Sequence, residues 1–269
     1  MECKIVFSDI DGTVLNSNHH VLPSTTKAVK KLLQKDIPFV LVSARMPEAI
    51  KTITDEMDVK IPIISYGGAL VLDEEKNTLY DKKITAIDTM NMIEKIKSLW
   101  ADKVVINYYT DNNWYVEDTE NKAVKREENI TKVKSKQAPF NQLIKDNILP
   151  NKLLCMTEPP ICEKMEKVLK DMFPELKIMR SSPILLEIMD KSVSKADGIK
   201  IMLNHFNLDR KQSIAFGDNY NDVDMLDFVG LGVAMNNAPE GVKKIANDVT
   251  DDNDHDGIYN FLSKMNLVK

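Results

Sequence analysis

The sequence predicts a doubly wound α/β core, in which helices cover a mostly parallel sheet, with an inserted α+β cap domain. Apolar runs suited to buried strands alternate with helical patterns in the first and last parts of the chain. Several of these runs end in polar or acidic residues, as ligand-binding edges of open α/β sheets do. The alternation stops in the middle of the chain. We therefore expect a core of residues 1–82 and 189–269 and an inserted domain of residues 83–188.

The composition supports a globular protein able to bury a core. The chain has 269 residues, of which 43% are hydrophobic and 29% charged, with a formal net charge of −5. Because no long basic block occurs, nucleic acid and anionic membranes are not expected as partners. The apolar runs are shorter than a membrane span, and the N-terminus does not have the pattern of a signal peptide. Three cysteines without CxxC spacing fit a protein of the reducing cytoplasm. The protein is also expected to be a monomer or a weak homodimer.

The first part of the chain is predicted to form three buried strands with helices between them. The strands are expected at residues 5–7, 37–42 and 61–65, and the helices begin at Pro23 and Pro47. Short apolar stretches at 71–72 and 78–80 flank an acidic turn and predict a hairpin.

The inserted segment follows a different pattern. Helices are predicted at 87–100 and 162–172, and strands at 104–109, 114–116, 153–156, 177–179 and 185–188. The polar stretch 118–137 is interpreted as a loop or a solvated helix. Four aromatic residues in the predicted hairpin either line a pocket or pack within the sheet: Tyr108, Tyr109, Trp114 and Tyr115.

The core pattern resumes near Ser192. Ser194 is a good N-cap for a helix that extends to Phe206. Strands are expected at 213–216 and 231–235, and helices from Asn221, from Pro239 to Ala246 and at the end of the chain.

Asp9 and Asp11 directly follow the first buried strand. Because side chains alternate between the faces of a strand with a period of two, both carboxylates can point the same way while Ile10 points away. A turn is the alternative interpretation, since Asp and Gly are common in turns. Two acids at this spacing, directly after a buried strand and before Gly12-Thr13, favour a functional site.

Further polar residues are predicted at the same edge of the sheet. Parallel strands bring their carboxyl ends together, so residues distant in sequence can meet there. The candidates beside Asp9 and Asp11 are Ser43, Lys195, Asp218, Asn221 and Asp222. Clustered carboxylates repel one another, and Mg²⁺, which prefers oxygen ligands and bridges carboxylates to phosphate, removes that repulsion. Lys195, near a helix N-terminus, and Ser43 can bind phosphate.

Each of these residues taken alone has a simpler interpretation. Ser43 can be a loop serine, Lys195 a solvated helix lysine, and Asp218 part of an Asx turn. Arg45 is interpreted as a surface charge and is given no role. Phosphate chemistry is favoured because all of these residues occur in the right order along the chain, at positions predicted to bind ligands.

These motifs resemble those of the haloacid dehalogenase superfamily, specifically the Cof-like hydrolases with a large cap. The segment Asp9–Thr13 resembles the first motif, Ser43 the second, Lys195 the third and Gly217–Asp222 the fourth. The tail from Val233 to Ala238, with Lys243 and Asp256-Gly257, also fits the Cof-like pattern. Three positions depart from the family pattern: Ala44, Gly67 and Ala196. None removes a catalytic group, although the change at Gly67 weakens inference of the substrate from relatives.

The resemblance implies a Rossmann-like core and a magnesium-dependent phosphoric monoester hydrolase acting on small phosphorylated metabolites such as sugar phosphates. Asp9 would be the nucleophile that forms an aspartyl-phosphate, and Asp11 the general acid and base. The resemblance also implies two sets of binding residues. Magnesium would be held by Asp9, the Asp11 carbonyl and Asp218, with Asp222 in support; the phosphoryl group would be held by Ser43, the amides of Ile10 and Ala44, Lys195 and Asn221.

Two other functions remain open. A signalling receiver also places acids, a Ser or Thr and a Lys around a phosphorylated Asp, but it needs no second acid at this spacing and no inserted cap. A phosphotransferase or phosphomutase on sugar phosphates would use the same core and the same covalent intermediate. The cap side chains that would select the substrate form no readable motif.

Overall fold

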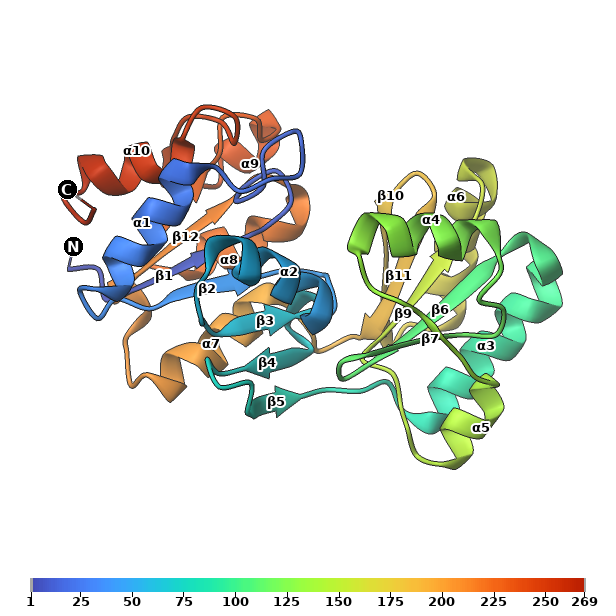
Figure 1. Ribbon diagram of the computed structural model, residues 1–269. Helices are drawn as coiled ribbons and strands as arrows, with labels where there is room; N and C mark the ends of the chain where they lie inside the picture. The colour runs from blue at the N-terminus through green and yellow to red at the C-terminus, as the bar shows by residue number, and fades with distance from the viewer. Residues whose placement is uncertain (1, 269) are drawn as a thin grey trace. The chain divides into compact units, whose positions relative to one another are not determined.

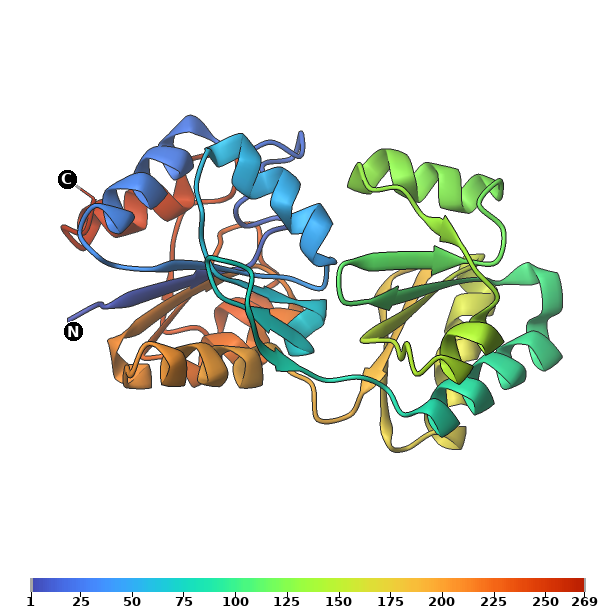
Figure 2. The same cartoon turned by 60° about the horizontal axis from the view of Figure 1, so that its bottom comes forward.

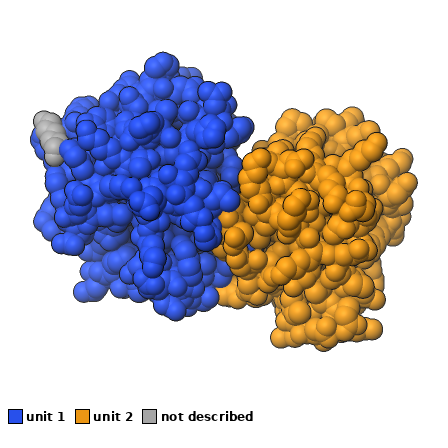
Figure 3. Space-filling model, viewed as in Figure 1, with its two compact units in different colours: residues 1–45, 50–80, 194–269 blue, residues 46–49, 81–193 orange. Residues whose placement is uncertain are grey.

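The computed structural model describes residues 2–268, which form two compact units (Figure 3). Unit 1 holds residues 2–45, 50–80 and 194–268, and unit 2 holds residues 46–49 and 81–193. Met1 and Lys269, the ends of the predicted core, lie outside the described residues. No helix within residues 2–268 is both long enough and apolar enough to cross a membrane.

Unit 1 is built on a mostly parallel sheet with the strand order β14-β13-β12-β1-β2-β3-β4-β5 (Figure 1). The strands are β1 (Ile5–Ser8), β2 (Phe39–Val42), β3 (Ile63–Ser65), β4 (Leu70–Leu72), β5 (Thr78–Asp81), β12 (Ser213–Gly217), β13 (Leu231–Ala234) and β14 (Asp248–Val249). Strand β1 pairs in parallel with both β12 and β2, while β3 and β4 are antiparallel. The central strands are fully buried, which explains their continuous apolar sequences.

Helices cover both faces of this sheet. They are α1 (Pro23–Leu33), α2 (Pro47–Met57), α7 (Lys195–His205), α8 (Val223–Phe228), α9 (Glu240–Lys243) and α10 (Gly257–Lys264), with short 3₁₀ segments η1 (Tyr66–Gly68), η3 (Arg210–Gln212) and η4 (Tyr220–Asp222). Figure 2 shows α1, α2 and α10 on one face and α7 on the other. The doubly wound α/β prediction is therefore confirmed. The predicted helix at Asn221 begins only at Val223, after η4.

The α7 face shows what holds the core of unit 1 together. Ile199, Met202 and Leu203 occupy positions i, i+3 and i+4, so they project from one side of the helix. They belong to one buried cluster with Val40 and Val42 of β2. Burying an apolar side chain of this size stabilises a fold by roughly 1.5–3 kcal/mol. This packing fixes α7, and with it Lys195 at its first turn, against the sheet.

Unit 2 has an α+β architecture with its own sheet and its own core. The sheet order is β10-β11-β9-β6-β7-β8. Its strands are β6 (Val105–Thr110), β7 (Asn113–Val116), β8 (Lys136–Gln137), β9 (Lys152–Met156), β10 (Leu176–Ser182) and β11 (Leu185–Asp190). Its helices are α3 (Ala86–Trp100), α4 (Lys122–Thr131), α5 (Phe140–Lys145) and α6 (Pro159–Met172), with the 3₁₀ segment η2 (Ala101–Lys103).

The polar stretch 118–137 contains the polar helix α4, which agrees with the helix interpretation of this segment, although not all of its charged residues face solvent. Asn121 caps α4 by accepting a hydrogen bond from the Ala123 amide, and Glu128 of α4 is buried. The segment ends in β8, which pairs in parallel with β7. Glu128 can be buried because it accepts hydrogen bonds from Lys134 and Ser135, which the periodicity of apolar residues does not reveal.

Two of the four aromatic residues of the predicted hairpin, Tyr108 and Trp114, pack in the interior of unit 2. The Tyr108 hydroxyl donates to the Ile148 carbonyl, and the Trp114 ring nitrogen donates to Asn107. Both rings are almost fully buried, so their role is packing within the unit.

Candidate active site

Three strand ends and one helix start meet at one edge of the unit 1 sheet. Asp9 follows β1, Ser43 follows β2 and Asp218 follows β12, the strands that lie next to one another in parallel. The ladder continues into these residues, because the Asp9 amide donates to the Phe216 carbonyl and the Ser43 amide to the Ile64 carbonyl. The backbone therefore holds the residues in fixed positions at the carboxyl edge.

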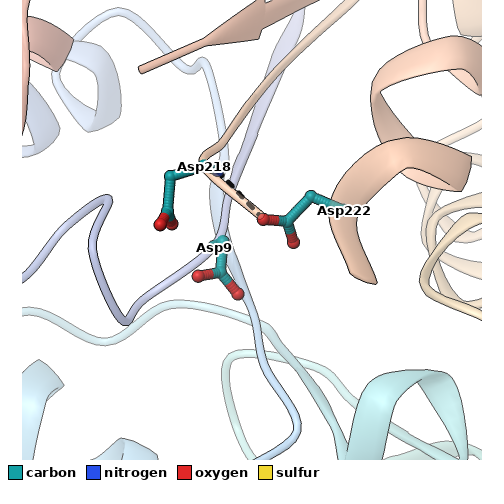
Figure 4. A group of neighbouring side chains, drawn as sticks. All are labelled: Asp9, Asp218 and Asp222. Carbon is teal, nitrogen blue, oxygen red and sulfur yellow. Dashed lines mark hydrogen bonds between the residues drawn. The ribbon is translucent and has the colours of Figure 1, made fainter. Parts of the chain in front are cut away.

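Three carboxylates cluster at this edge: Asp9, Asp218 and Asp222 (Figure 4). One oxygen of each lies within 4.8 Å of an oxygen of the others. Asp9 is 6% exposed and Asp222 is fully buried, so water screens their charges poorly. Such a group is costly unless a cation or protons compensate its charge.

Lys195 supplies part of that compensation. Its amine donates to Oδ1 of Asp9 and, at 2.5 Å, to Oδ1 of Asp222. It is the first residue of α7, whose N-cap Ser194 accepts a hydrogen bond from the Asp197 amide. The lysine that the sequence suggests as a phosphate ligand is thus placed among the carboxylates, at a helix N-terminus that favours anions.

The pKa values of the cluster reflect this crowding. Burial, and then the charge of Asp222, raise the pKa of Asp9 well above its usual value, although Lys195 opposes the shift. Burial raises the pKa of Asp218 to about 6, against a hydrogen bond from Thr13 that lowers it. Burial lowers the pKa of Lys195, but the charges of Asp222 and Asp9 outweigh it and the net shift is upward. Lys195 therefore stays charged, and the acids still lack positive charge.

Asp222 also organises the loop that carries Asp218. Its Oδ2 accepts hydrogen bonds from the amides of Asp218 at 3.0 Å and Asn219 at 2.9 Å. With Lys195 on its other oxygen, Asp222 has both oxygens engaged by the protein. This arrangement suits the supporting role expected of it, and leaves Asp9 and Asp218 as the more available ligands for a cation.

Gly12 and Thr13 contact Asp218 from the loop after β1. The Thr13 hydroxyl donates to Oδ1 of Asp218, and a Cβ placed on Gly12 would lie 2.4 Å from Oδ2. Gly12 has φ of +80°, a conformation that residues with a Cβ rarely adopt. The sequence places Thr13 in the motif Asp9–Thr13 but assigns it no role of its own. Its membership of that motif is the signal that could have indicated its role.

The Asp11 side chain points to a different partner from the other acids. Arg45 donates from Nε to Oδ2 of Asp11 at 2.8 Å and from Nη2 to Oδ1 at 2.6 Å. The interpretation of Arg45 as a mere surface charge is therefore wrong, because its guanidinium forms a bidentate ion pair with a predicted site residue.

The remaining predicted phosphate-binding residues lie on the same loops. Ser43 is buried, and its hydroxyl accepts a hydrogen bond from the Arg45 amide, while Ala44 lies between these two residues. The Ile10 side chain is fully buried, so a contact with phosphate would have to come from its backbone. Asn221 is exposed on η4, next to Asp222.

Comparison with known proteins identifies relatives over nearly the whole length. The sequence model of the haloacid dehalogenase-like hydrolases matches residues 6–262. A Haemophilus influenzae protein named "Putative phosphatase" is 37% identical over 260 residues, which are 96% of each chain.

Solved structures agree with this match. The crystal structure of TM0651 from Thermotoga maritima superposes with a TM-score of 0.87 at 28% identity, covering 97% of both chains. A structure described as the sugar phosphatase BT4131, of subclass IIB, gives a TM-score of 0.84 at 25% identity, covering 98% of this chain and 99% of the other. The similarity thus extends over both units.

Proposed function

This chain belongs to the haloacid dehalogenase-like hydrolase family, and we propose that it is a magnesium-dependent phosphatase of small phosphomonoesters that works through an aspartyl-phosphate. The observation that carries the proposal is the convergence of Asp9, Asp218 and Lys195 at the carboxyl edge of the sheet, with Asp11 two residues from Asp9. Family membership supplies the phosphatase class. The roles of individual residues are those that the resemblance of the motifs to this family implies.

In the first step, an oxygen of Asp9 attacks phosphorus and the bond from phosphorus to the leaving oxygen breaks. The leaving oxygen takes a proton from the carboxyl group of Asp11. The product alcohol leaves, and Asp9 carries the phosphoryl group. The candidate donors to its oxygens are Ser43, the amides of Ile10 and Ala44, Lys195 and Asn221.

In the second step, water attacks the same phosphorus and Asp11 takes a proton from it. The bond between phosphorus and Asp9 breaks, which restores the Asp9 carboxylate and releases inorganic phosphate. Asp11 gains here the proton that it gave in the first step, so the cycle balances without any other reactant.

A divalent cation fits the acidic cluster. The donors are all oxygens, and when the three acids are ionised Lys195 offsets only one of their charges. Asp9, Asp218 and the Asp11 carbonyl would hold Mg²⁺, with Asp222 in support, as hard oxygen donors suit this ion. When bound, it would neutralise charge on the phosphoryl oxygens and keep Asp9 ionised.

The proposed substrates are sugar phosphates or similar metabolites. The support is the description of BT4131 as a sugar phosphatase, together with a second unit whose sheet and core are independent of unit 1. We assign unit 2 the selection of the leaving group. A cytoplasmic location and a monomeric or weakly dimeric state stay predictions.

Kinetics of two variants on an aryl phosphate test the proposal. Asp9→Asn should abolish both turnover and covalent labelling, whereas Asp11→Asn should slow turnover on the order of 10²–10⁴-fold. EDTA should abolish wild-type activity and Mg²⁺ should restore it. Phosphate released should equal substrate consumed; a deficit, with phosphoryl groups found on an added sugar, would instead indicate a phosphotransferase. Full activity of Asp9→Asn, or of the wild type in excess EDTA, would contradict the proposal.

A further inference from the structure

The contact between Arg45 and Asp11 has the geometry of a fixed pair. Two nitrogens of the guanidinium reach the two carboxylate oxygens at 2.8 and 2.6 Å. This bidentate arrangement fixes the plane of the carboxyl group as well as its position, which a single hydrogen bond does not. The Arg45 side chain is 20% exposed and that of Asp11 51%, so the arginine is the more embedded partner.

The backbone of Arg45 is anchored on both sides. Its amide donates to the Ser43 hydroxyl at 3.1 Å, and its carbonyl accepts from the Ser65 hydroxyl at 2.5 Å and from the Tyr66 amide at 3.2 Å. Ser43 and Ser65 lie at the ends of neighbouring parallel strands. The guanidinium is therefore carried by a rigid part of the sheet edge. An ordinary exposed ion pair, with two long mobile side chains, has no such anchoring and contributes little.

A carboxyl group held in this way can still exchange a proton. A carboxylate offers about four lone-pair sites for hydrogen bonds, and an arginine in a bidentate contact occupies two of them. One site on each Asp11 oxygen therefore stays available while rotation of the group is blocked. Proton transfer to a leaving group depends strongly on such orientation, and a misplacement of about 1 Å can cost on the order of 10²-fold in rate.

We propose that Arg45 is a positioning residue that acts through Asp11, orienting its carboxyl group for proton transfer to the leaving oxygen. The inference rests on the proposed function, because it takes Asp11 as the proton donor. It assigns a role in the reaction to a residue for which the sequence alone indicated none. Its consequence is that the effect of Arg45 depends on how much the leaving group needs a proton.

The test uses the full-length protein with Mg²⁺ and a series of phosphomonoesters, from 4-nitrophenyl phosphate through phenyl phosphate to an alkyl phosphate. We expect Arg45→Ala to lower kcat/KM roughly 10- to 100-fold for the alkyl ester, where the leaving oxygen needs a proton. The loss should be much smaller for 4-nitrophenyl phosphate. Arg45→Lys should lose as much activity as Arg45→Ala, because a lysine ammonium cannot reproduce the two parallel hydrogen bonds of the guanidinium. Arg210→Ala, which removes an arginine that contacts Phe228, is the matched control and should leave the series unchanged.

A double variant separates action through Asp11 from direct action on the phosphate. If Arg45 works through Asp11, then Asp11→Asn combined with Arg45→Ala should match Asp11→Asn alone across the aryl esters. Each of the following results would overturn the inference: an equal loss for every leaving group, a further loss in the double variant, or full recovery with Arg45→Lys. If Asp11→Asn itself loses no activity, the acid assignment of the proposed function fails and the inference falls with it. A normal Arg45→Ala beside an impaired Asp11→Asn overturns the inference alone.

Discussion

The hydroxyl of Thr13 donates a hydrogen bond of 2.8 Å to Oδ1 of Asp218, 205 residues further along the chain. The bond joins the loop after β1 to the loop after β12, two strands that pair in parallel. It orients a carboxylate that also lies close to Asp9 and Asp222. A neutral side chain therefore controls the direction of a proposed metal ligand.

Thr13→Val should weaken Mg²⁺ binding while preserving the shape of the residue. A hydrogen bond to a charged group contributes about 1.5–3 kcal/mol, which corresponds to roughly 10- to 100-fold in affinity. The measurement is the Mg²⁺ concentration that gives half-maximal activity, or half of the thermal shift. Thr13→Ser keeps the hydroxyl and is the matched control. Equal Mg²⁺ requirements in Thr13→Val and the wild type would show that the bond does not matter for the ion.

Gly12→Ala should damage the same site by another route. The new Cβ would lie 2.4 Å from an oxygen of Asp218, and φ of +80° is unfavourable for alanine. We expect a loss of at least about 1 kcal/mol in the free energy of unfolding, with weaker Mg²⁺ binding because Asp218 must move.

Gly241→Ala is the control for this change. Gly241 lies in α9, where a Cβ would meet the exposed side chain of Tyr220, which can move away. Alanine favours a helix over glycine, so stability should be unchanged or slightly higher. If Gly12→Ala and Gly241→Ala behave alike in urea unfolding and Mg²⁺ binding, the close approach of Gly12 to Asp218 is not a constraint.

The sheet and the loops at its edge follow from patterns that a sequence displays. Continuous apolar runs such as Ile5–Phe7 predict buried parallel strands, and the rule that such strands share one edge brings Asp9 and Asp218 together. The doubly wound α/β class is confirmed by the sheet order and the helices on both faces.

Side-chain directions do not follow from such patterns. The sequence spacing of Asp11 and Arg45 does not reveal their bidentate ion pair, because the contact depends on side-chain rotamers and on the exact separation of two loops. The burial of Glu128 was equally hidden, since a charged residue in a polar helix is usually solvated. Both features appear only when hydrogen-bond partners are known.

Glu128→Gln should destabilise unit 2 at neutral pH. Hydrogen bonds from Lys134 and then from Ser135 lower the pKa of Glu128 to about 2, so its charged form is stabilised by folding. A lowered carboxyl pKa stabilises the fold above the unfolded value of 4.5, and this contribution is lost as pH falls toward 2. Hydrogen bonds to a charged group contribute about 1.5–3 kcal/mol, the loss expected in urea unfolding at pH 7.

The difference between Glu128→Gln and the wild type should shrink as pH is lowered below 4.5. Glu163→Gln is the matched control in α6, because Glu163 makes an exposed pair with Lys167 four residues away. Such exposed pairs contribute little to stability, so this variant should be nearly neutral. A Glu128→Gln protein as stable as Glu163→Gln at pH 7 would contradict the prediction.

Asp218→Asn should become more stable relative to the wild type as pH rises, when Mg²⁺ is absent. Burial raises the Asp218 pKa from 3.8 to about 6, so folding disfavours its charged form. The cost of ionising Asp218 in the folded protein is absent below the unfolded pKa, grows between pH 4 and 6, and is complete above pH 6. At about 1.4 kcal/mol per pKa unit, this cost reaches on the order of 3 kcal/mol. Urea unfolding of both proteins in EDTA across this range measures it. In Mg²⁺ at pH 8 the order should reverse, because the charged ligand is then paired with a cation. A stability difference that is constant with pH in EDTA would rule out a partly buried, ionising Asp218.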